Sequence, residues 1–168
     1  MADTAVQRIY LERMTAATAR GALLAGLKSG ADLLNYFGHA SLFARDHGVL
    51  SATDAAKLAG QGQLPVMLGM TCGMNRFEWP QYISLGEALL RNPAGGAAAV
   101  WSSGGYSYDL KASALNDALL AALLQQRVPR LGDAIQAALA GTAQSLGPAA
   151  APGIYNLLGD PATLNPMY

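Results

Sequence analysis

Cysteine and histidine are scarce in this sequence, and that scarcity limits the chemistry it can perform. Its 168 residues include one cysteine, Cys72, and two histidines, His39 and His47. A single thiol excludes an intramolecular disulfide and every metal site built from several cysteines. One thiol and two imidazoles without ligand spacing also argue against a transition-metal site. Hydrolytic chemistry near neutral pH would have to be built from these few groups.

Charged residues are also few, and they balance. There are 11 basic and 11 acidic residues, for a formal net charge of +0, and charged residues make up only 13% of the chain. The lack of a positive excess argues against a nucleic-acid partner or a polybasic membrane anchor. No apolar run approaches about eighteen residues, so we expect no membrane insertion. With 52% hydrophobic residues, the chain can still form the core of one domain.

The first residues, Met1 to Thr4, contain no targeting signal of secretory type, because they have neither a basic start nor an apolar stretch. Taken literally, this start predicts a cytoplasmic protein. An expression start placed on an internal fragment would look the same, and composition does not separate the two.

Short apolar runs alternate with helix-patterned stretches, which is typical of an α/β layer structure. We expect strands at residues 7–12, 33–37, 65–70 and 97–101, and a short strand or extended segment at 154–158. We expect helices at residues 15–28, 51–59, 84–90, 110–126 and 131–140. Two of these helices begin with a capping box, Ser51 with Asp54 and Ser84 with Glu87.

Unusual residues follow three of the predicted strands. Gly38-His39-Ala40-Ser41 follows one strand, Thr71-Cys72-Gly73 the next, and a loop at 102–108 the third. The carboxyl ends of parallel strands meet at one edge of a sheet, and neighbouring strands lie about 5 Å apart. A thiol and an imidazole placed there could act as nucleophile and proton-transfer partner. The alternative is ordinary packing, because a lone cysteine is usually a small buried hydrophobe and a lone histidine is usually structural.

Five blocks of the sequence together resemble the gingipain-like cysteine peptidases of the caspase-like clan. The blocks are residues 35–41, 65–72 with Phe77, 84–90, 95–100 and 157–161. Their order and separation carry the resemblance, which extends from about Gln7 to Leu164. It implies a caspase-like three-layer α/β/α fold with a mostly parallel sheet.

The resemblance also implies roles for individual residues. His39 and Cys72 correspond to the catalytic dyad, in which the cysteine attacks the peptide carbonyl and the histidine transfers protons. The backbone N–H groups of Cys72 and Ala40 correspond to the oxyanion site. The family commonly has glycine where this chain has Ala40, whose methyl group narrows the approach for substrate.

A substrate pocket is implied as well. The loop that begins at Ser102 and carries Tyr106 and Tyr108 matches the segment lining the family's primary specificity pocket. These rings suit an apolar or stacked side chain, and Asp109 is the only acid nearby, so a basic side chain is not indicated. Trp79, with Phe77, would either border the substrate cleft or pack against the cysteine loop.

The chain departs from the family pattern before Gln7, where family members carry a further strand–helix unit. In caspase-like sheets that strand lies centrally, between the counterparts of residues 7–12 and 33–37. The carboxylate that orients the histidine in gingipains comes from the same region. We therefore expect residues 1–168 to be one catalytic subdomain of a longer protein, or a chain that pairs with another copy.

The leading hypothesis is a cysteine endopeptidase acting on polypeptide substrates, with its activity in isolation open. A non-enzymatic caspase-like scaffold or assembly module is the main alternative, and another thiol hydrolase or acyltransferase is a third. A secreted or cell-surface location, and calcium binding, are implied by the resemblance alone. No other cofactor is expected.

We expect His47 to be a solvated loop side chain, Glu87 to cap its helix rather than act in catalysis, and Asp160 to fix a turn.

Overall fold

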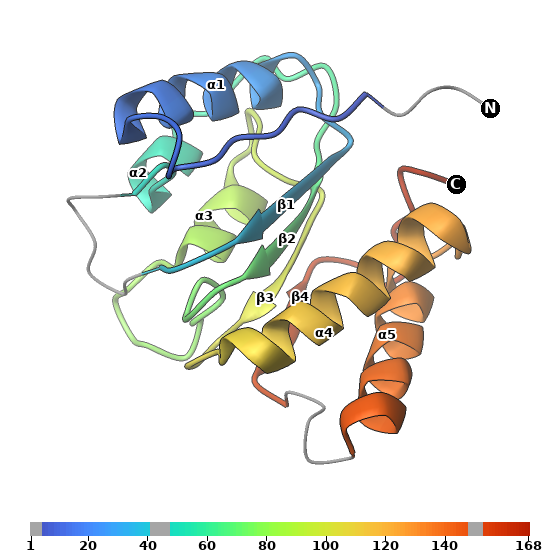
Figure 1. Ribbon diagram of the computed structural model, residues 1–168. Helices are drawn as coiled ribbons and strands as arrows, with labels where there is room; N and C mark the ends of the chain where they lie inside the picture. The colour runs from blue at the N-terminus through green and yellow to red at the C-terminus, as the bar shows by residue number, and fades with distance from the viewer. Residues whose placement is uncertain (1–4, 41–47, 148–152) are drawn as a thin grey trace.

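A parallel sheet with one antiparallel edge strand organises the chain (Figure 1). The computed structural model describes residues 5–40, 48–147 and 153–168. Its strands are β1 Leu33–Phe37, β2 Val66–Met70, β3 Ala99–Ser103 and β4 Tyr155–Leu158. Its helices are α1 Ala16–Lys28, α2 Ala52–Ala55, α3 Leu85–Arg91, α4 Asp109–Leu120 and α5 Leu131–Leu146, and the π-helical segment Ala121–Gln125 extends α4.

The strands lie side by side in the order β1-β2-β3-β4. The first three are parallel, and β4 runs antiparallel to β3. Phe37 pairs with Met70 at the end of β1, and Gly69 pairs with Ser102 near the end of β3. The carboxyl ends of the three parallel strands therefore meet at one edge of the sheet, where sites form in such folds.

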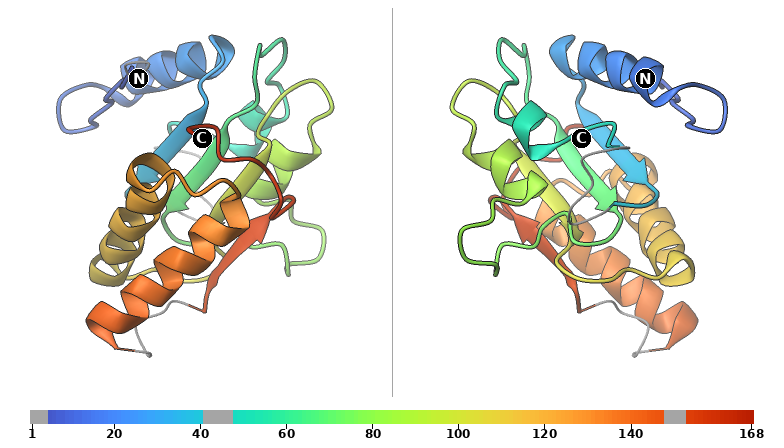
Figure 2. Two further views of the ribbon diagram at one scale, coloured as in Figure 1. Left: turned by 90° about the vertical axis from the view of Figure 1, so that its right-hand side faces the viewer. Right: turned by 90° about the vertical axis from the view of Figure 1, so that its left-hand side faces the viewer.

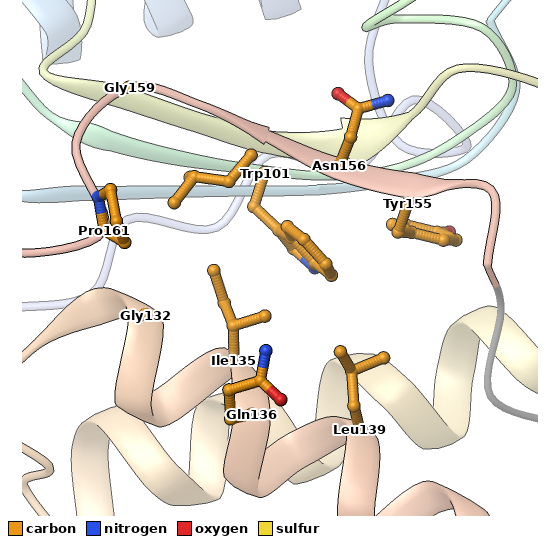
Figure 3. Close-up of a pocket in the computed structure, with 10 residues that line it drawn as sticks. Trp101, Gly132, Ile135, Gln136, Leu139, Tyr155, Asn156, Gly159 and Pro161 are labelled. Atoms are coloured by element: carbon orange, nitrogen blue, oxygen red, sulfur yellow. The ribbon is translucent and has the colours of Figure 1, made fainter.

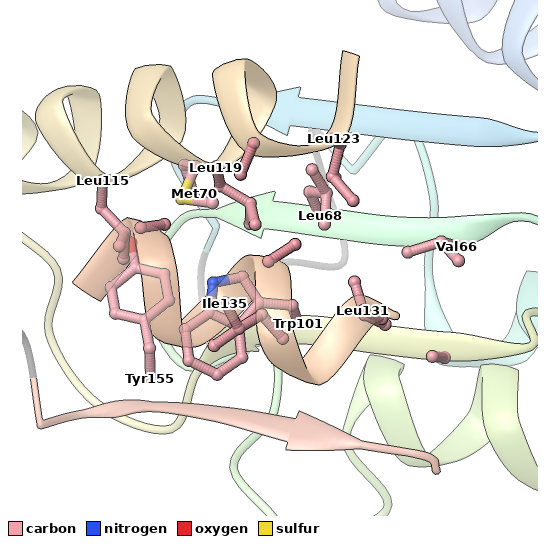
Figure 4. Close-up of a cluster of buried hydrophobic side chains, with 14 of the residues drawn as sticks. Val66, Leu68, Met70, Trp101, Leu115, Leu119, Leu123, Leu131, Ile135 and Tyr155 are labelled. Carbon is pink, nitrogen blue, oxygen red and sulfur yellow. The ribbon is translucent and has the colours of Figure 1, made fainter. Parts of the chain in front are cut away.

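Helices cover both faces of the sheet (Figures 1 and 2). On one face, α4 and α5 pack on Leu68 and Trp101 through an apolar cluster that includes Leu119 and Ile135 (Figure 4). On the other face, α1, α2 and α3 pack on Met67 and Val100. The alternation of adjacent strand residues between the two clusters is what a sheet covered on both faces requires. The predicted three-layer α/β/α fold is thus confirmed.

Most predicted elements are confirmed, and three of them differ from the prediction by two or more residues at an end. β3 begins and ends two residues later than expected, so Ser102 and Ser103 belong to the strand. α2 is a single turn that ends at Ala55, and α5 continues to Leu146. α5 continues through Gly141, and the added turn is packed against the core because Thr142 is buried, with its hydroxyl donating to Ala138 O at 2.8 Å.

The strand predicted at residues 7–12 is wrong. This segment has no strand pairing and is mostly exposed, and Arg13 N–H closes a turn onto Tyr10 O at 3.0 Å. Its alternating pattern favours a strand, but a strand needs a neighbouring backbone to satisfy its hydrogen bonds. The segment runs past α1 instead, where the Gln7 side chain lies against Gly26.

Both predicted capping boxes are present, and each positions a helix. Ser84 caps α3 with Glu87, and Ser51 caps α2 with Asp54. Asp54 also forms a two-point ion pair with Arg20 of α1, in which Nη2 lies 2.6 Å from Oδ1 and Nη1 contacts Oδ2. This pair ties α1 to α2. Among the described residues, no helix is both long enough and apolar enough to span a bilayer.

The Arg20–Asp54 pair predicts a pH-dependent contribution to stability. Hydrogen bonds from Arg20, and then from Ser51, hold the pKa of Asp54 well below its usual range. The contribution is therefore present above the unfolded-state pKa of about 4 and is lost as the pH falls below it. Asp54→Asn should lower the urea midpoint at pH 7, and the difference from wild type should shrink at pH 3. Asp117→Asn, an exposed site on α4, is the control, and an equal loss at both pH values would contradict the prediction.

Candidate active site

His39 and Cys72 lie at matching positions beyond two adjacent strands. Phe37 and Met70 form the last pair of the β1–β2 ladder, and Gly38 N–H still donates to Met70 O at 3.3 Å. His39 and Cys72 each follow that pair by two residues. Adjacent strands are about 5 Å apart, so the structure brings the two residues to the same edge of the sheet. Among the described residues, no hydrogen bond joins their side chains.

The backbone of His39 is held by its own strand. The Tyr36 hydroxyl donates to His39 O at 2.6 Å, and burial raises the pKa of this phenol, which therefore remains a donor at neutral pH. The His39 side chain is exposed. Ala40, the second predicted oxyanion residue, is also exposed, whereas Ser41 and His47 lie outside the described residues.

Cys72 lies in a tight turn that one buried hydroxyl organises. Gly73, the next residue, has φ +60°, a conformation that favours glycine. The Ser103 hydroxyl donates to Thr71 O, accepts from Gly73 N–H at 3.0 Å and lies 2.9 Å from Gly105 O. Ser103 has no exposed surface. One side chain of β3 therefore fixes the peptides on both sides of the cysteine.

Cys72 is half-buried, and its sulfur contacts Ser107 in the loop that follows β3. Ser107 N–H donates to Sγ at 3.4 Å, and Ser107 O lies 3.7 Å from Sγ. The Ser107 hydroxyl in turn lies 2.7 Å from the Tyr155 hydroxyl of β4.

The backbone N–H groups near the cysteine differ in their partners. Gly73 N–H donates to Gly105 O at 2.9 Å as well as to Ser103. Within the described part of the chain, neither Cys72 N–H nor Ala40 N–H has an acceptor. A peptide N–H without a partner beside a thiol is what an oxyanion site requires.

Asn75 ties the cysteine loop to the centre of the sheet. It has no exposed surface. Its amide nitrogen donates to Val100 O and Asn156 O, both at 3.1 Å, and its backbone N–H donates to Ser103 O at 2.9 Å. The loop after β2 is thereby bonded to both β3 and β4.

Arg76 links the cysteine loop to the loop after β3. Its Nε donates to Glu78 at 3.0 Å and to Gly104 O at 3.2 Å, and its guanidinium lies 4.7 Å from the centre of the Trp79 ring. Trp79 is therefore held at the surface by stacking on the arginine. Trp79 was expected either to border the substrate cleft or to pack against the cysteine loop. Both alternatives are compatible with this arrangement, because the ring packs on its own loop and remains 37% exposed.

The pocket candidates differ in accessibility. Tyr106 and Tyr108 are each 73% exposed, on either side of Ser107. The expectation that Ser102 borders a substrate pocket is corrected. Ser102 lies within β3 with no exposed surface, and its hydroxyl donates to Gly69 O at 2.6 Å. Its side chain is part of the sheet interior and presents no surface to a substrate.

The cavity drawn in Figure 3 is separate from this edge. Its volume is about 400 Å³, and it lies where Ile135 and Leu139 of α5 face Trp101 and Tyr155 of the sheet. His39 and Cys72 do not line it. We interpret it as a gap between α5 and the edge strand, not as the site.

The assignments of two carboxylates, Glu87 and Asp160, are confirmed. Glu87 bonds Ser84 as a cap, and Asp160 accepts from Ala162 N–H at 2.8 Å within a turn. Calcium prefers several carboxylate and carbonyl oxygens. In the part of the chain that the structure describes, no three His, Cys, Asp or Glu residues are grouped to hold a metal ion.

Five residues that organise the site were not found from the sequence: Asn75, Arg76, Ser103, Ser107 and Tyr155. Their contacts join segments that are far apart in the chain, such as Ser107 and Tyr155, which are 48 positions apart. The available signal was compositional, since Asn75 and Ser103 are polar residues that follow predicted apolar strands within a few positions.

A sequence model described as peptidase family C25 matches residues 1–165. No curated protein sequence matches the chain. Among solved structures, the fold resembles that of the Arg-specific cysteine proteinase gingipain R (RgpB), with 20% identity over 87% of this chain and 36% of that one, and a TM-score of 0.75.

Two further solved structures are similar. A complex of Porphyromonas gingivalis RgpB pro- and mature domains gives 19% identity over 87% of this chain and 37% of that one, with a TM-score of 0.74. A structure described as a protease gives 18% identity over 84% and 37%, with a TM-score of 0.67. At these identities the likeness concerns the fold, and the chain spans little more than a third of the length of the solved chains it matches.

The Ser103 hydroxyl gives a direct test of how the cysteine turn is held. Ser103→Ala leaves Thr71 O and Gly73 N–H without this partner in a buried position, which should cost about 1–3 kcal/mol of unfolding free energy. Urea denaturation measures the loss, and amide exchange at Gly73 should accelerate. Ser145→Ala removes an exposed helical hydroxyl as a control. A loss no larger than that of the control would contradict the prediction.

Proposed function

Because the chain belongs to peptidase family C25, the gingipain-like cysteine peptidases, we propose that it is the catalytic part of a cysteine endopeptidase that uses Cys72 and His39 as a dyad. The observation that carries this proposal is their placement two residues beyond the paired Phe37 and Met70. The half-buried state of Cys72 also favours an enzyme, since a purely structural cysteine would be fully buried.

The chemistry follows from the groups present. His39 takes the proton of the Cys72 thiol, and the thiolate attacks the carbonyl carbon of a peptide bond. The negative charge on the carbonyl oxygen is stabilised by the backbone N–H groups of Cys72 and Ala40. When the intermediate collapses, the C–N bond breaks and the leaving amine takes the proton from His39. Water, activated by His39, then hydrolyses the thioester and restores the thiol.

The exposed rings of Tyr106, Tyr108 and Trp79 are the proposed walls for the substrate side chain. They come from the loop after β3 and the loop after β2, which Arg76 joins through Gly104 O. Aromatic walls without a buried carboxylate favour an apolar or stacked side chain of a polypeptide substrate. By the family resemblance, we also propose a secreted or cell-surface location, which cell fractionation of the natural full-length protein tests.

The dyad predicts an activated thiol. At pH 7, iodoacetamide should modify Cys72 at least about tenfold faster than free cysteine, because a neighbouring imidazole favours the thiolate. His39→Ala should remove this advantage, whereas His47→Ala, which removes the other imidazole, should retain it. Mass spectrometry measures the rates, both for this chain and for the natural full-length protein. A Cys72 that reacts like free cysteine in both would overturn the proposed function.

We also propose that a further strand pairs with β1. Among the described residues, β1 pairs with β2 alone. Asp32 O accepts from Val66 N–H at 3.0 Å, and Gly38 N–H donates to Met70 O. In a parallel ladder these bonds alternate, so the N–H and C=O groups of Leu33, Asn35 and Phe37 point to the open edge. An open edge of this kind is a template for another strand.

Hydrogen exchange tests this pairing. In the chain alone, the amides of Asn35 and Phe37 should exchange faster than those of Leu34 and Tyr36. In the natural full-length protein, or at concentrations where two copies associate, the exchange rates of the Asn35 and Phe37 amides should fall by roughly tenfold or more. Light scattering over the same concentrations separates a second copy from a segment of the same polypeptide. Unprotected Asn35 and Phe37 in both situations would contradict the proposal.

A further inference from the structure

The backbone N–H and the backbone carbonyl of one residue, Ser107, both contact the Cys72 sulfur. Ser107 N–H lies 3.4 Å from Sγ and Ser107 O lies 3.7 Å from it. The N–H stabilises a thiolate, whereas the carbonyl accepts a hydrogen bond from the neutral thiol. The orientation of Ser107 therefore influences which form of the sulfur is favoured.

Ser107 is anchored by its side chain within an otherwise exposed loop. Its neighbours Tyr106 and Tyr108 are both 73% exposed. Its hydroxyl lies 2.7 Å from the Tyr155 hydroxyl. This side-chain contact joins the loop to the edge strand β4 at the level of the thiol.

Tyr155 is well suited to act as the fixed end of this contact. It is 8% exposed, and its ring packs on Trp101 with the ring centres 5.8 Å apart. Burial, and then the nearby Cys72 sulfur, raise the pKa of Tyr155, while Ser107 opposes the rise. The phenol therefore stays protonated at neutral pH, and its hydroxyl can hydrogen-bond to Ser107 there.

We propose that Tyr155 is a positioning residue for Cys72, because its hydroxyl holds Ser107 so that the Ser107 N–H remains on the sulfur. The inference rests on the proposed function. It places a residue from the distant edge strand in a short series of contacts that runs from Trp101 through Tyr155 and Ser107 to the nucleophile. Because Ser107 lies between Tyr106 and Tyr108, the same anchor also fixes the loop that carries the proposed substrate-binding rings.

Other titratable groups also lie on the segments that meet at Cys72. They are His39 after β1, Arg76 and Glu78 in the cysteine loop, Tyr155 on β4, and Asp109 at the start of α4. Arg76 and Glu78 pair with each other at 3.0 Å. Tyr155→Phe leaves His39, Arg76, Glu78 and Asp109 unchanged, so it isolates the contact of the Tyr155 hydroxyl with Ser107.

Tyr155→Phe keeps the ring that packs on Trp101 and removes the hydroxyl. We expect the apparent pKa of Cys72, taken from the pH dependence of iodoacetamide modification, to rise. The rate at pH 7 should fall roughly three- to tenfold, the worth of one hydrogen bond, and the limiting rate at high pH should be unchanged. Tyr168→Phe, which removes a hydroxyl from a side chain that is 71% exposed, is the matched control.

Ser107→Ala removes the other end of the contact and should reproduce the effect. The double variant should be no slower than either single variant, because both remove the same interaction. Unfolding midpoints verify that each variant is folded. An unchanged pH profile in folded Tyr155→Phe, or additive effects in the double variant, would overturn the inference.

The outcomes also separate this inference from the proposed function. If Cys72 is activated by His39 but Tyr155→Phe leaves its pH profile unchanged, the dyad stands and the positioning role is wrong. If wild-type Cys72 reacts like free cysteine and Tyr155→Phe still raises its apparent pKa, the peptidase proposal fails and the positioning role stands.

Discussion

The buried side-chain amide of Asn75 is the interaction on which the site edge depends. It donates to Val100 O of β3 and Asn156 O of β4, and the Asn75 backbone donates to Ser103 O. Leaving a buried carbonyl without its partner costs about 1–3 kcal/mol, so two such groups hold the loop firmly. Gly86 makes room for the amide, because a Cβ there would overlap Asn75 Oδ1.

From Asn75 the same principle extends to Cys72, the proposed nucleophile. Ser103 fixes the peptides around Cys72, and Ser107 contacts the sulfur. These contacts use hydroxyl, amide and backbone groups, whereas charged residues make up only 13% of the chain. Neutral hydrogen bonds suit a buried edge, because ionised groups would carry a much larger desolvation cost there.

The sequence located most accurately the strand whose composition is simplest, and it placed β3, whose last two residues are polar, two residues too early. The limits of β1 are confirmed because its apolar run ends at Gly38. β3 was placed two residues early because Ser102 and Ser103 resemble loop residues, yet Gly69 O and Thr71 O satisfy their hydroxyls. His39 and Cys72 could be located because strand ends are visible in sequence. Contacts such as Ser107 with Tyr155 depend on tertiary packing, which no local pattern encodes.

The two proposed catalytic side chains are supported unequally, and this has a mechanistic consequence. Cys72 follows β2, which has a strand on each side, and its turn is bonded to β3. His39 follows β1, which has β2 on one side only, and its side chain is exposed. The nucleophile is thus held by the core, whereas the imidazole is held by an edge. A strand that pairs with β1 would therefore act first on the orientation of His39, and so on proton transfer, while the position of the thiol would remain set by Ser103 and Ser107.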